Sequence, residues 1–257
     1  LTNLADLERV HEIASRVAGG DDAFRAKPFY ALYLEPLSPL HIETSVAERA
    51  LFCAEHEVPF TFAAGANSGS GSPITVEGGV AQGGAESLAG LVLTTLKNPN
   101  SRFIYASNTS SADMRSMVVS YGAPEWYRTV AIYAELGAYY GLPTWGTAGC
   151  TDAYRLDAQA AHEAHEGIIL ALQCGTTLAH DVGYMAFGSL YDARFLVLCN
   201  AMIDRAKRLL APLELTDERL GLDAIAEAAR TAMPYMAMEH TVDHFRDCLW
   251  LPPDFIN

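Results

Sequence analysis

Residues 142–184 read LPTWGTAGCTDAYRLDAQAAHEAHEGIILALQCGTTLAHDVGY, and this stretch predicts a complete strand–helix–strand unit. Two short apolar runs, LPTWGTAG and TTLAHDVGY, flank a segment in which apolar residues recur at helical spacing (157–174). Strands that are joined through a helix run parallel in one sheet, with a right-handed crossover. The stretch therefore indicates an α/β fold.

The same alternation continues towards both ends of the chain. Further strands are predicted at 29–38, 58–66 and 102–108, which together with 142–149 and 176–184 make five. Further helices are predicted at 1–19, 45–57, 75–97, 124–141, about 190–211 and 220–232. Since five strands cannot close an eight-stranded barrel and the chain opens on a helix, we expect the C-terminal part of a (β/α)8 TIM-type barrel. It would be a single partial domain over 1–257, with three N-terminal βα units missing. A complete doubly wound sheet is the alternative.

Composition narrows the classes of function. The formal net charge of −14 argues against a nucleic-acid partner and suits a cationic substrate through long-range steering. No stretch approaches the roughly 20 uncharged apolar residues that span a bilayer, so no membrane partner is expected. The five cysteines are scattered and form no CxxC pair, which favours a reduced, cytoplasmic location.

Two motifs have both a functional and a structural interpretation. The Gly/Ser loop GANSGSGS (65–72) follows a predicted strand but lacks the G-x-G-x-x-G spacing, so we interpret it as an active-site loop rather than a dinucleotide site. Imidazoles lie three or four residues apart in HEAHE (162–166) and EHTVDH (239–244), a spacing that can bind zinc. HEAHE is not HEXXH and no cysteine lies nearby, so we expect solvated helix faces and no metal site.

Polar and aromatic residues gather at the predicted carboxyl ends of the strands, where barrel enzymes keep their active sites. His180 and Asp181 close the fifth strand, and we predict that this pair is catalytic, as acid, base or polar contact. A satisfied core histidine is the alternative. Several strand-end aromatics would form a cage for a quaternary ammonium by cation–π attraction, with Glu35 adding negative charge. The aromatics are Tyr33, Phe62, Tyr105, Trp145 and Tyr184, and the predicted substrate-binding residues are Glu35, Tyr105, Trp145, Asp152 and Tyr184.

Five stretches resemble the trimethylamine methyltransferase family, which includes betaine methyltransferases without pyrrolysine. They are GSGSPITVEGGVAQGGAESLAGLVLTTLKNP (69–99), DMRS (113–116) with YGAPEW (121–126), YYGLPTWGTAGCTDAYRLDAQAAHE (139–163) and GTTLAHDVGY (175–184). The combination is specific and runs through nearly the whole chain.

The resemblance implies a barrel enzyme that moves a methyl group from a methylated amine or quaternary ammonium to the Co(I) corrinoid of a separate partner protein. It implies no tightly bound cofactor; the corrinoid (cobalamin) would come with the partner, and we expect a homo-oligomer. His180 would lie beside the cobalt and the substrate, and Asn67 and Gly69 would face the cofactor. Trimethylamine-specific members carry pyrrolysine at a position that falls within 150–155 here, and its absence favours a betaine-like substrate. The sequence HDVGY (180–184) resembles the trimethylamine branch of the family more than the betaine branch.

Two other functions stay open at this point. One is another β/α-barrel enzyme, such as a lyase or an S-adenosylmethionine-dependent methyltransferase. Lys27 and Lys97 precede strands rather than follow them, which disfavours Schiff-base lyase chemistry. The other is a betaine-binding fragment without catalytic activity.

Overall fold

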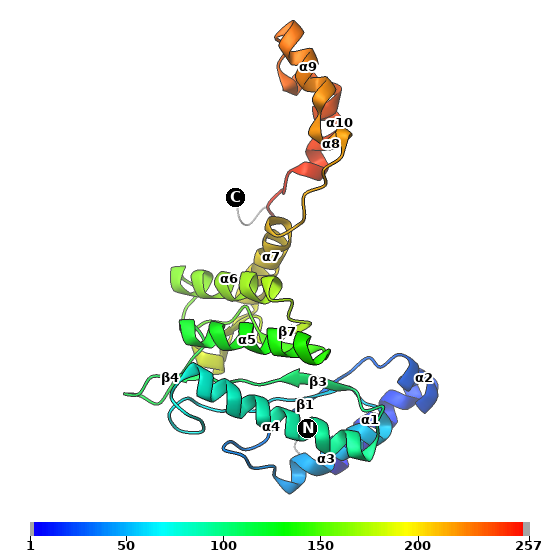
Figure 1. Ribbon diagram of the computed structural model, residues 1–257, viewed down its shortest axis with the longest axis vertical. Helices are drawn as coiled ribbons and strands as arrows, with labels where there is room; N and C mark the ends of the chain where they lie inside the picture. Colours follow the sequence, from blue (N-terminus) through cyan, green and yellow to red (C-terminus); the bar gives the residue numbers. More distant parts are fainter. Residues whose placement is uncertain (1–2, 254–257) are drawn as a thin grey trace. The chain divides into compact units, whose positions relative to one another are not determined.

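Five parallel strands form one sheet in the computed structural model, which describes residues 3–253 (Figure 1). They are β1 (Leu32–Leu34), β2 (Phe60–Phe62), β3 (Phe103–Ala106), β6 (Thr144–Thr147) and β7 (Leu178–His180), and they pair in the order β1-β2-β3-β6-β7. Because each strand lies beside the next one along the chain, right-handed crossovers place all connecting helices on the same face, as in a barrel and unlike a doubly wound sheet. The predicted α/β fold, with five parallel strands of a TIM-type barrel, is confirmed.

The sheet is curled into half a barrel. Tyr33 belongs to β1 and His180 to β7, the two edges of the sheet, yet their ring centroids lie only 6.1 Å apart. In a flat sheet, four strand spacings would separate these edges by about 19 Å. The curl therefore brings residues from opposite edges of the sheet to face one another.

Helices cover the outer face of this half barrel. α3 (Thr44–His56), α4 (Val76–Lys97), α5 (Pro124–Tyr140) and α6 (Ala158–Gln173) each follow a strand, and α1 (Leu4–Ala18) and α2 (Asp21–Ala26) precede β1 (Figure 1). Their ends carry the expected signals: α5 begins with Pro124 and ends at Gly141 with a φ of 67°, and the Asp157 carboxylate accepts from the Ala160 amide at the start of α6. The short helix α2 was not predicted, because Gly19-Gly20 indicates only a stop.

Strands are shorter than the apolar runs that predicted them. Only Phe60–Phe62 of the run 58–66 pairs as a strand, although residues 63–66 stay largely buried. Beyond the strand the chain leaves the sheet and forms single bridges, such as the one between Ala64 and Ser107. Two small antiparallel hairpins were also not predicted, β4 (Ser111–Ala112) with β5 (Val119–Ser120) and β8 (Tyr184–Met185) with β9 (Leu190–Tyr191).

Glycines let α4 approach the sheet closely. A Cβ on Gly90 would lie 2.5 Å from the Phe62 ring, and one on Gly83 would lie 2.5 Å from the Tyr133 hydroxyl. Phe62 is fully buried, so its ring has no free space into which it can turn. The small residues of VEGGVAQGGAESLAG therefore allow a helix to pack directly on β2 and on the segment after β3.

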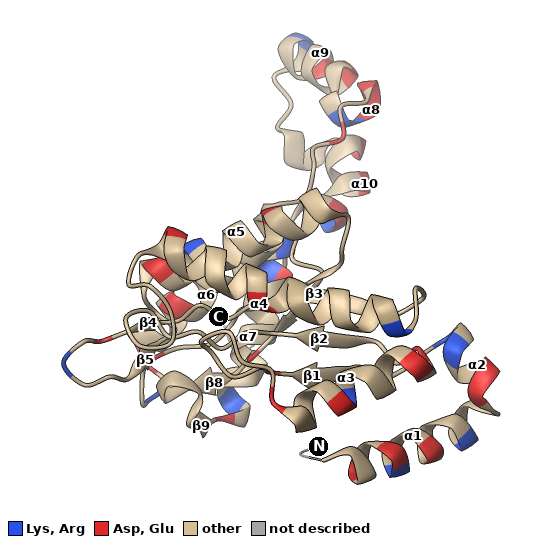
Figure 2. Cartoon of the chain, turned by 60° about the horizontal axis from the view of Figure 1, so that its bottom comes forward, with Lys and Arg blue, Asp and Glu red and all other residues tan. Residues whose placement is uncertain are grey.

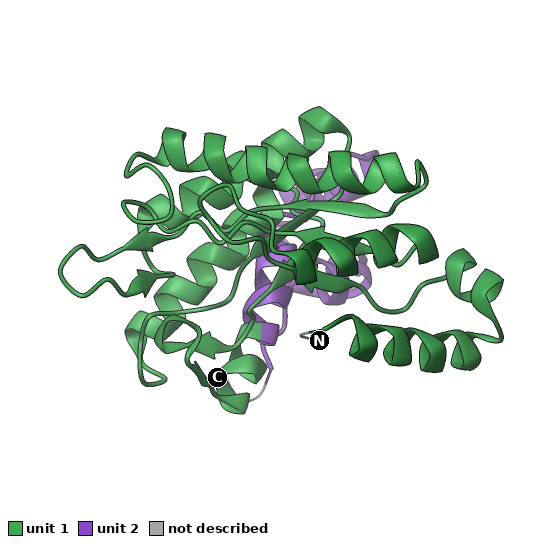
Figure 3. Cartoon of the chain, turned by 90° about the horizontal axis from the view of Figure 1, so that it is seen from below, with its two compact units in different colours: residues 1–199 green, residues 200–257 purple. Residues whose placement is uncertain are grey.

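The chain divides into two compact units, residues 1–199 and 200–257 (Figure 3). The first contains the whole sheet, whose strands carry no charged residue, so acidic and basic side chains lie on helices and loops (Figure 2). The second contains α8 (Asp217–Leu220), α9 (Leu222–Thr231), the 3-10 turn η2 (Tyr235–Ala237) and α10 (Glu239–Cys248), and α7 (Ala193–Leu209) runs through the division. That the chain folds as one partial-barrel domain stays a prediction.

The close packing of α4 predicts that substitutions at two neighbouring positions of this helix differ in their effect on the free energy of unfolding. Gly90→Val would force β-branched bulk into the Phe62 ring and should lower the free energy of unfolding by roughly 1–3 kcal/mol. Ala89→Val changes the exposed neighbour and should cost only about 0.5 kcal/mol through helix propensity. Urea unfolding followed by circular dichroism measures both, and equal shifts would contradict the close approach.

Candidate functional site

A cavity of about 440 Å³ lies inside the curl, towards the carboxyl ends of the strands. Tyr33, Trp145 and His180 come from β1, β6 and β7, and Tyr184 is the first residue of the short strand β8. The other lining residues come from loops that follow strands. The complete lining is Tyr33, Asn108, Tyr121, Trp145, His180, Asp181 and Tyr184. Four of the predicted site residues, Trp145, His180, Asp181 and Tyr184, therefore meet at one cavity.

The His180 ring is held on both nitrogens. Its Nδ1 lies 2.7 Å from Asp181 Oδ1, and its Nε2 lies 3.2 Å from the Thr147 hydroxyl. A carboxylate can only accept, so Nδ1 carries the proton, and in the neutral ring Nε2 accepts from Thr147. The side chains of His180 and Asp181 are only 21% and 13% exposed. The ring is therefore fixed in orientation, with its face available to neighbours.

Three rings form the core of the cavity wall. The centroid of His180 lies 5.2 Å from that of Trp145 and 6.1 Å from that of Tyr33, and the Tyr33 and Trp145 centroids lie 6.2 Å apart. The indole Nε1 of Trp145 is buried and has no hydrogen-bond partner among the described residues. Clustered aromatic faces attract organic cations. Of the five aromatics predicted for a cage, Tyr33, Trp145 and Tyr184 line this cavity and Phe62 and Tyr105 do not.

Negative charge flanks these rings. Burial, followed by the nearby carboxylates of Glu35 and Asp181, raises the pKa of Tyr33 well above its usual range. Glu35 itself does not line the cavity. Its carboxyl lies against Gly65, where desolvation raises the pKa of Glu35 although the residue as a whole is exposed. Asn108 donates to the Tyr33 hydroxyl at 3.0 Å and fixes that wall.

A strained turn follows β7. Asp181 has a φ of 65°, a left-handed conformation that costs a residue other than glycine about 1 kcal/mol or more. The turn closes when the Tyr184 amide donates to the Asp181 carbonyl at 3.0 Å, and the Thr151 amide donates to the Tyr184 carbonyl at 3.0 Å. The strained turn thereby places both Asp181 and Tyr184 at the cavity.

Asp152 lies beneath the cavity wall rather than in it. Its carboxylate accepts from the backbone amides of Tyr121 at 2.7 Å and Gly122 at 3.1 Å, and from the Ser120 hydroxyl. The sequence predicts that Asp152 contacts the substrate. The structure instead places it where it holds the segment that carries Tyr121.

Tyr105 lies on the opposite face of the sheet, so the expectation that it joins the cavity is wrong. It is 1% exposed, and its ring packs on Tyr133 and Tyr140 of α5 at centroid distances of 6.1 and 5.6 Å. Side chains alternate along a strand, and Ala106, the register partner of Trp145, takes the inward position instead.

Asn67 and Gly69 do not line the cavity either. The Asn67 carbonyl accepts from the amides of Ser70, Gly71 and Ser72, and its side-chain oxygen accepts from the Ser110 hydroxyl. Gly69 is exposed at the tip of the loop, with a φ of 85°. The loop is thus folded on itself through Asn67.

Two lining residues, Asn108 and Tyr121, were not predicted. Asn108 follows β3 by two residues, and a polar residue just after a strand was the signal that could have found it. Tyr121 comes from the segment between β5 and α5, and its only signal in the sequence was its place in the YGAPEW stretch.

One histidine of each helical pair has a carboxylate neighbour. His162 lies 3.7 Å from Glu166 on an exposed face of α6, and His244 lies 3.6 Å from Glu218. Within residues 3–253, no group of three or more histidine, cysteine, aspartate or glutamate residues is placed to hold a metal ion. Over the same residues, no helix combines the length and apolar character needed to cross a membrane.

Comparison with known proteins shows which family the chain belongs to. The sequence model described as trimethylamine methyltransferase (MTTB) matches residues 2–255. The chain belongs to the trimethylamine methyltransferase family.

Relatives within this family carry two kinds of name. A trimethylamine methyltransferase MttB of Desulfitobacterium hafniense (strain DSM 10664 / DCB-2) is 31% identical over 241 residues, which cover 94% of this chain and 48% of the relative. MttB of Methanosarcina thermophila is 28% identical, over 86% of this chain and 46% of its own length. A glycine betaine methyltransferase of D. hafniense (strain Y51) is 30% identical, over 68% of this chain and 37% of its own. The chain thus spans about half the length of the MttB relatives.

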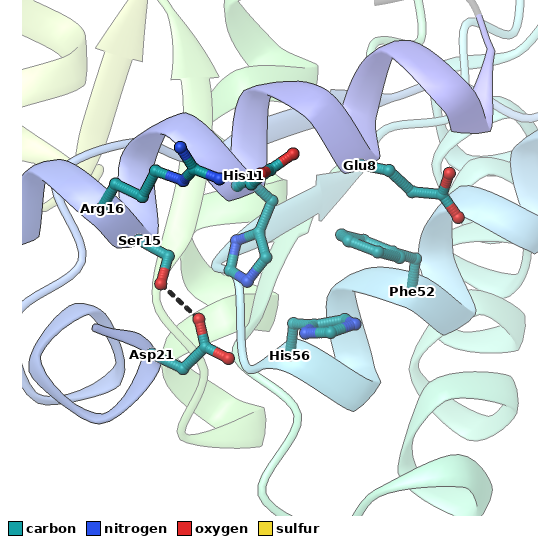
Figure 4. A pocket seen from close by; sticks show the side chains of 8 residues that line it. Glu8, His11, Ser15, Arg16, Asp21, Phe52 and His56 are labelled. Carbon is teal, nitrogen blue, oxygen red and sulfur yellow. Dashed lines mark hydrogen bonds and ion pairs between the residues drawn. The ribbon is translucent and has the colours of Figure 1, made fainter.

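A second cavity, of about 420 Å³, lies between α1, α2 and α3, and the residues that line it include His11, Asp21, Phe52 and His56 (Figure 4). His56 is the last residue of α3, which leads to the amino end of β2, so this cavity lies at the other end of the strands from the ring cluster. His11 is 6% exposed, its Nδ1 lies 3.1 Å from the Tyr30 hydroxyl, and its ring centroid lies 4.8 Å from that of His56.

The second cavity predicts a pH dependence in this family member. Burial, and then the neighbouring His56, lower the pKa of His11 below 6.5 in the folded state. Below pH 6.5 the unfolded chain therefore binds the proton more readily, so this contribution to stability is complete above that pH and is lost as the pH falls. Between pH 7.5 and 5.5 the free energy of unfolding should fall more for the wild type than for His11→Gln. His162→Gln, an exposed change, should behave as the wild type, and parallel curves for all three would refute the assignment.

Proposed function

We propose that this chain carries the methyl-transfer site of a corrinoid-dependent methyltransferase. It would bind a small methylated amine or quaternary ammonium and pass one methyl group to the Co(I) corrinoid of a partner protein. The observation that supports this most strongly is the ring-walled, acid-flanked cavity around His180, in a chain that belongs to a methyltransferase family. The partner, a cytoplasmic location and a homo-oligomeric state are parts of the same proposal.

Methyl transfer of this kind requires little acid–base catalysis. The nitrogen must be cationic, either quaternary or, in a tertiary amine, protonated. The carbon–nitrogen bond then breaks with both its electrons on nitrogen, which leaves as the neutral amine with one methyl fewer. The electron pair for the new bond to the methyl group would come from the Co(I) corrinoid of the docked partner. Such an in-line displacement depends on orientation and on exclusion of water. A cavity walled by Tyr33, Trp145 and Tyr121 supplies the orientation.

The residues at the cavity fit a methylated cation. The faces of Tyr33, Trp145 and His180 offer cation–π attraction, and the carboxylates of Asp181 and Glu35 add a favourable field. Names of relatives include both a trimethylamine and a glycine betaine enzyme, and the substrate class proposed here covers both.

His180 acts by position in this proposal. Since Asp181 and Thr147 engage its two nitrogens, neither is free to exchange a proton with substrate. The histidine instead presents its ring to the methyl-bearing group, and Asp181 fixes its tautomer. Gly69 lies at the exposed tip of its loop, and Asn67 orders that loop. Both residues stay in the proposal as residues that face the corrinoid.

The proposed function predicts that His180→Ala loses about 10²-fold or more in methyl-transfer rate, because small misplacements of reacting groups are costly. Substrate binding should weaken much less, since Tyr33 and Trp145 remain. The protein is mixed with cob(I)alamin and with trimethylamine or glycine betaine, and loss of the Co(I) absorbance is followed. His162→Ala, on the exposed face of α6, is the matched control.

Three results would count against the function. They are no amine-dependent change with the wild type, an unchanged rate for His180→Ala, or methylation that requires S-adenosylmethionine.

A further inference from the structure

Glu163 of α6 anchors the loop that follows β6. Its Oε2 accepts from the Thr151 hydroxyl at 2.5 Å and from the Asp152 amide at 2.8 Å, and its Oε1 accepts from Gln159 at 2.9 Å. The carboxyl also packs on Gly122, where a Cβ would lie 2.5 Å from its carbon. One half-buried carboxylate therefore touches two loops that are about 30 residues apart in the chain.

Asp152 continues this connection. Its backbone amide is bound by Glu163, and its own carboxylate receives the amides of Tyr121 and Gly122. The two carboxylates thus act in series, from α6 to the loop after β6 and from there to the segment before α5. Both use their oxygens as acceptors of hydrogen bonds from backbone and side-chain donors of these segments, and neither lines the cavity.

This series of hydrogen bonds ends at Tyr121 and Tyr184, two residues that line the cavity. Tyr121 lines the cavity and receives its backbone position from Asp152. Tyr184 lines it as well, and its carbonyl accepts from the amide of Thr151, whose hydroxyl is held by Glu163. Thr151 is fully buried, so this connection is shielded from water.

We propose that Glu163 and Asp152 are positioning residues that set Tyr121 and Tyr184, and through them the affinity of the cavity for its cation. Neither touches the ligand. The inference rests on the proposed function only for the nature of that ligand, an organic cation, because the placement of the two tyrosines follows from the hydrogen bonds alone.

The two carboxylates differ in how they tolerate an amide. The NH2 group of Glu163→Gln can point to Gln159, whose own amide can turn and accept from it, so the oxygen towards Thr151 and Asp152 is kept. Asp152→Asn has no such solution. Each Asp152 oxygen faces a backbone N–H, and an NH2 group on either side would meet a donor.

This difference gives the test, with tetramethylammonium as the probe and its dissociation constant measured by calorimetry. Asp152→Asn and Glu163→Ala should each weaken binding about tenfold, the loss of one well-placed hydrogen bond. Glu163→Gln should recover most of what Glu163→Ala loses. Glu166→Gln, on the same helix and paired with His162 at the surface, should bind as the wild type does.

A double-mutant cycle separates positioning from a general loss of stability. If Asp152 acts through Tyr121, Asp152→Asn should have little further effect in a Tyr121→Ala background. Additive effects, wild-type affinity in Asp152→Asn, or a Glu163→Gln variant as weak as Glu163→Ala would overturn the proposal.

Amide hydrogen exchange keeps this test apart from the proposed function. Exchange at Tyr121 and Gly122 should become faster in Asp152→Asn and Glu163→Ala, with or without a ligand. If the wild type bound no tetramethylammonium, the proposed function would fail, and unchanged exchange in these variants would separately overturn the positioning of Tyr121.

Discussion

The packing of rings inside the curled sheet is the constraint on which the site depends. β1 and β7 are edges of the same sheet, yet Tyr33 and His180 stand 6.1 Å apart because Trp145, from the strand between them and nearer to β7, packs against both. On the other face, glycines such as Gly90 let α4 lie directly on the strands. Without the curl, the residues that line the cavity would stand on separate parts of an open surface.

The cavity is rigid because most of its polar groups are already satisfied by the protein. His180 is held by Asp181 and Thr147, and Asn108 holds Tyr33. The left-handed backbone at Asp181 is compensated by hydrogen bonds that tie Tyr184 into the turn. A site of this kind orients a substrate, and methyl transfer to an external acceptor is a reaction that benefits from such orientation.

Sequence reasoning predicts the strands and the site unequally well. The alternation of apolar runs and helical spacing found all five strands and their order, because the strands of a parallel sheet appear in the sequence as short apolar runs between helices. Four residues that it predicted for the site, Trp145, His180, Asp181 and Tyr184, line one cavity. It misplaced Tyr105, because a strand buried on both faces gives no sign of which residue points inward. It assigned Asp152 to the substrate and missed Tyr121, because contacts between loops depend on tertiary packing that no local pattern encodes.

The most direct measurement of the central claim is an NMR titration of the histidine rings with tetramethylammonium, with the protein labelled on histidine alone. The chain has eight histidines, and His180→Asn assigns the resonance that matters. If the ring cluster is the cation site, the His180 signals should shift and saturate, while those of His11 in the second cavity and of the exposed His162 stay in place. Shifts confined to His11, or none at His180 at saturating cation, would contradict the account.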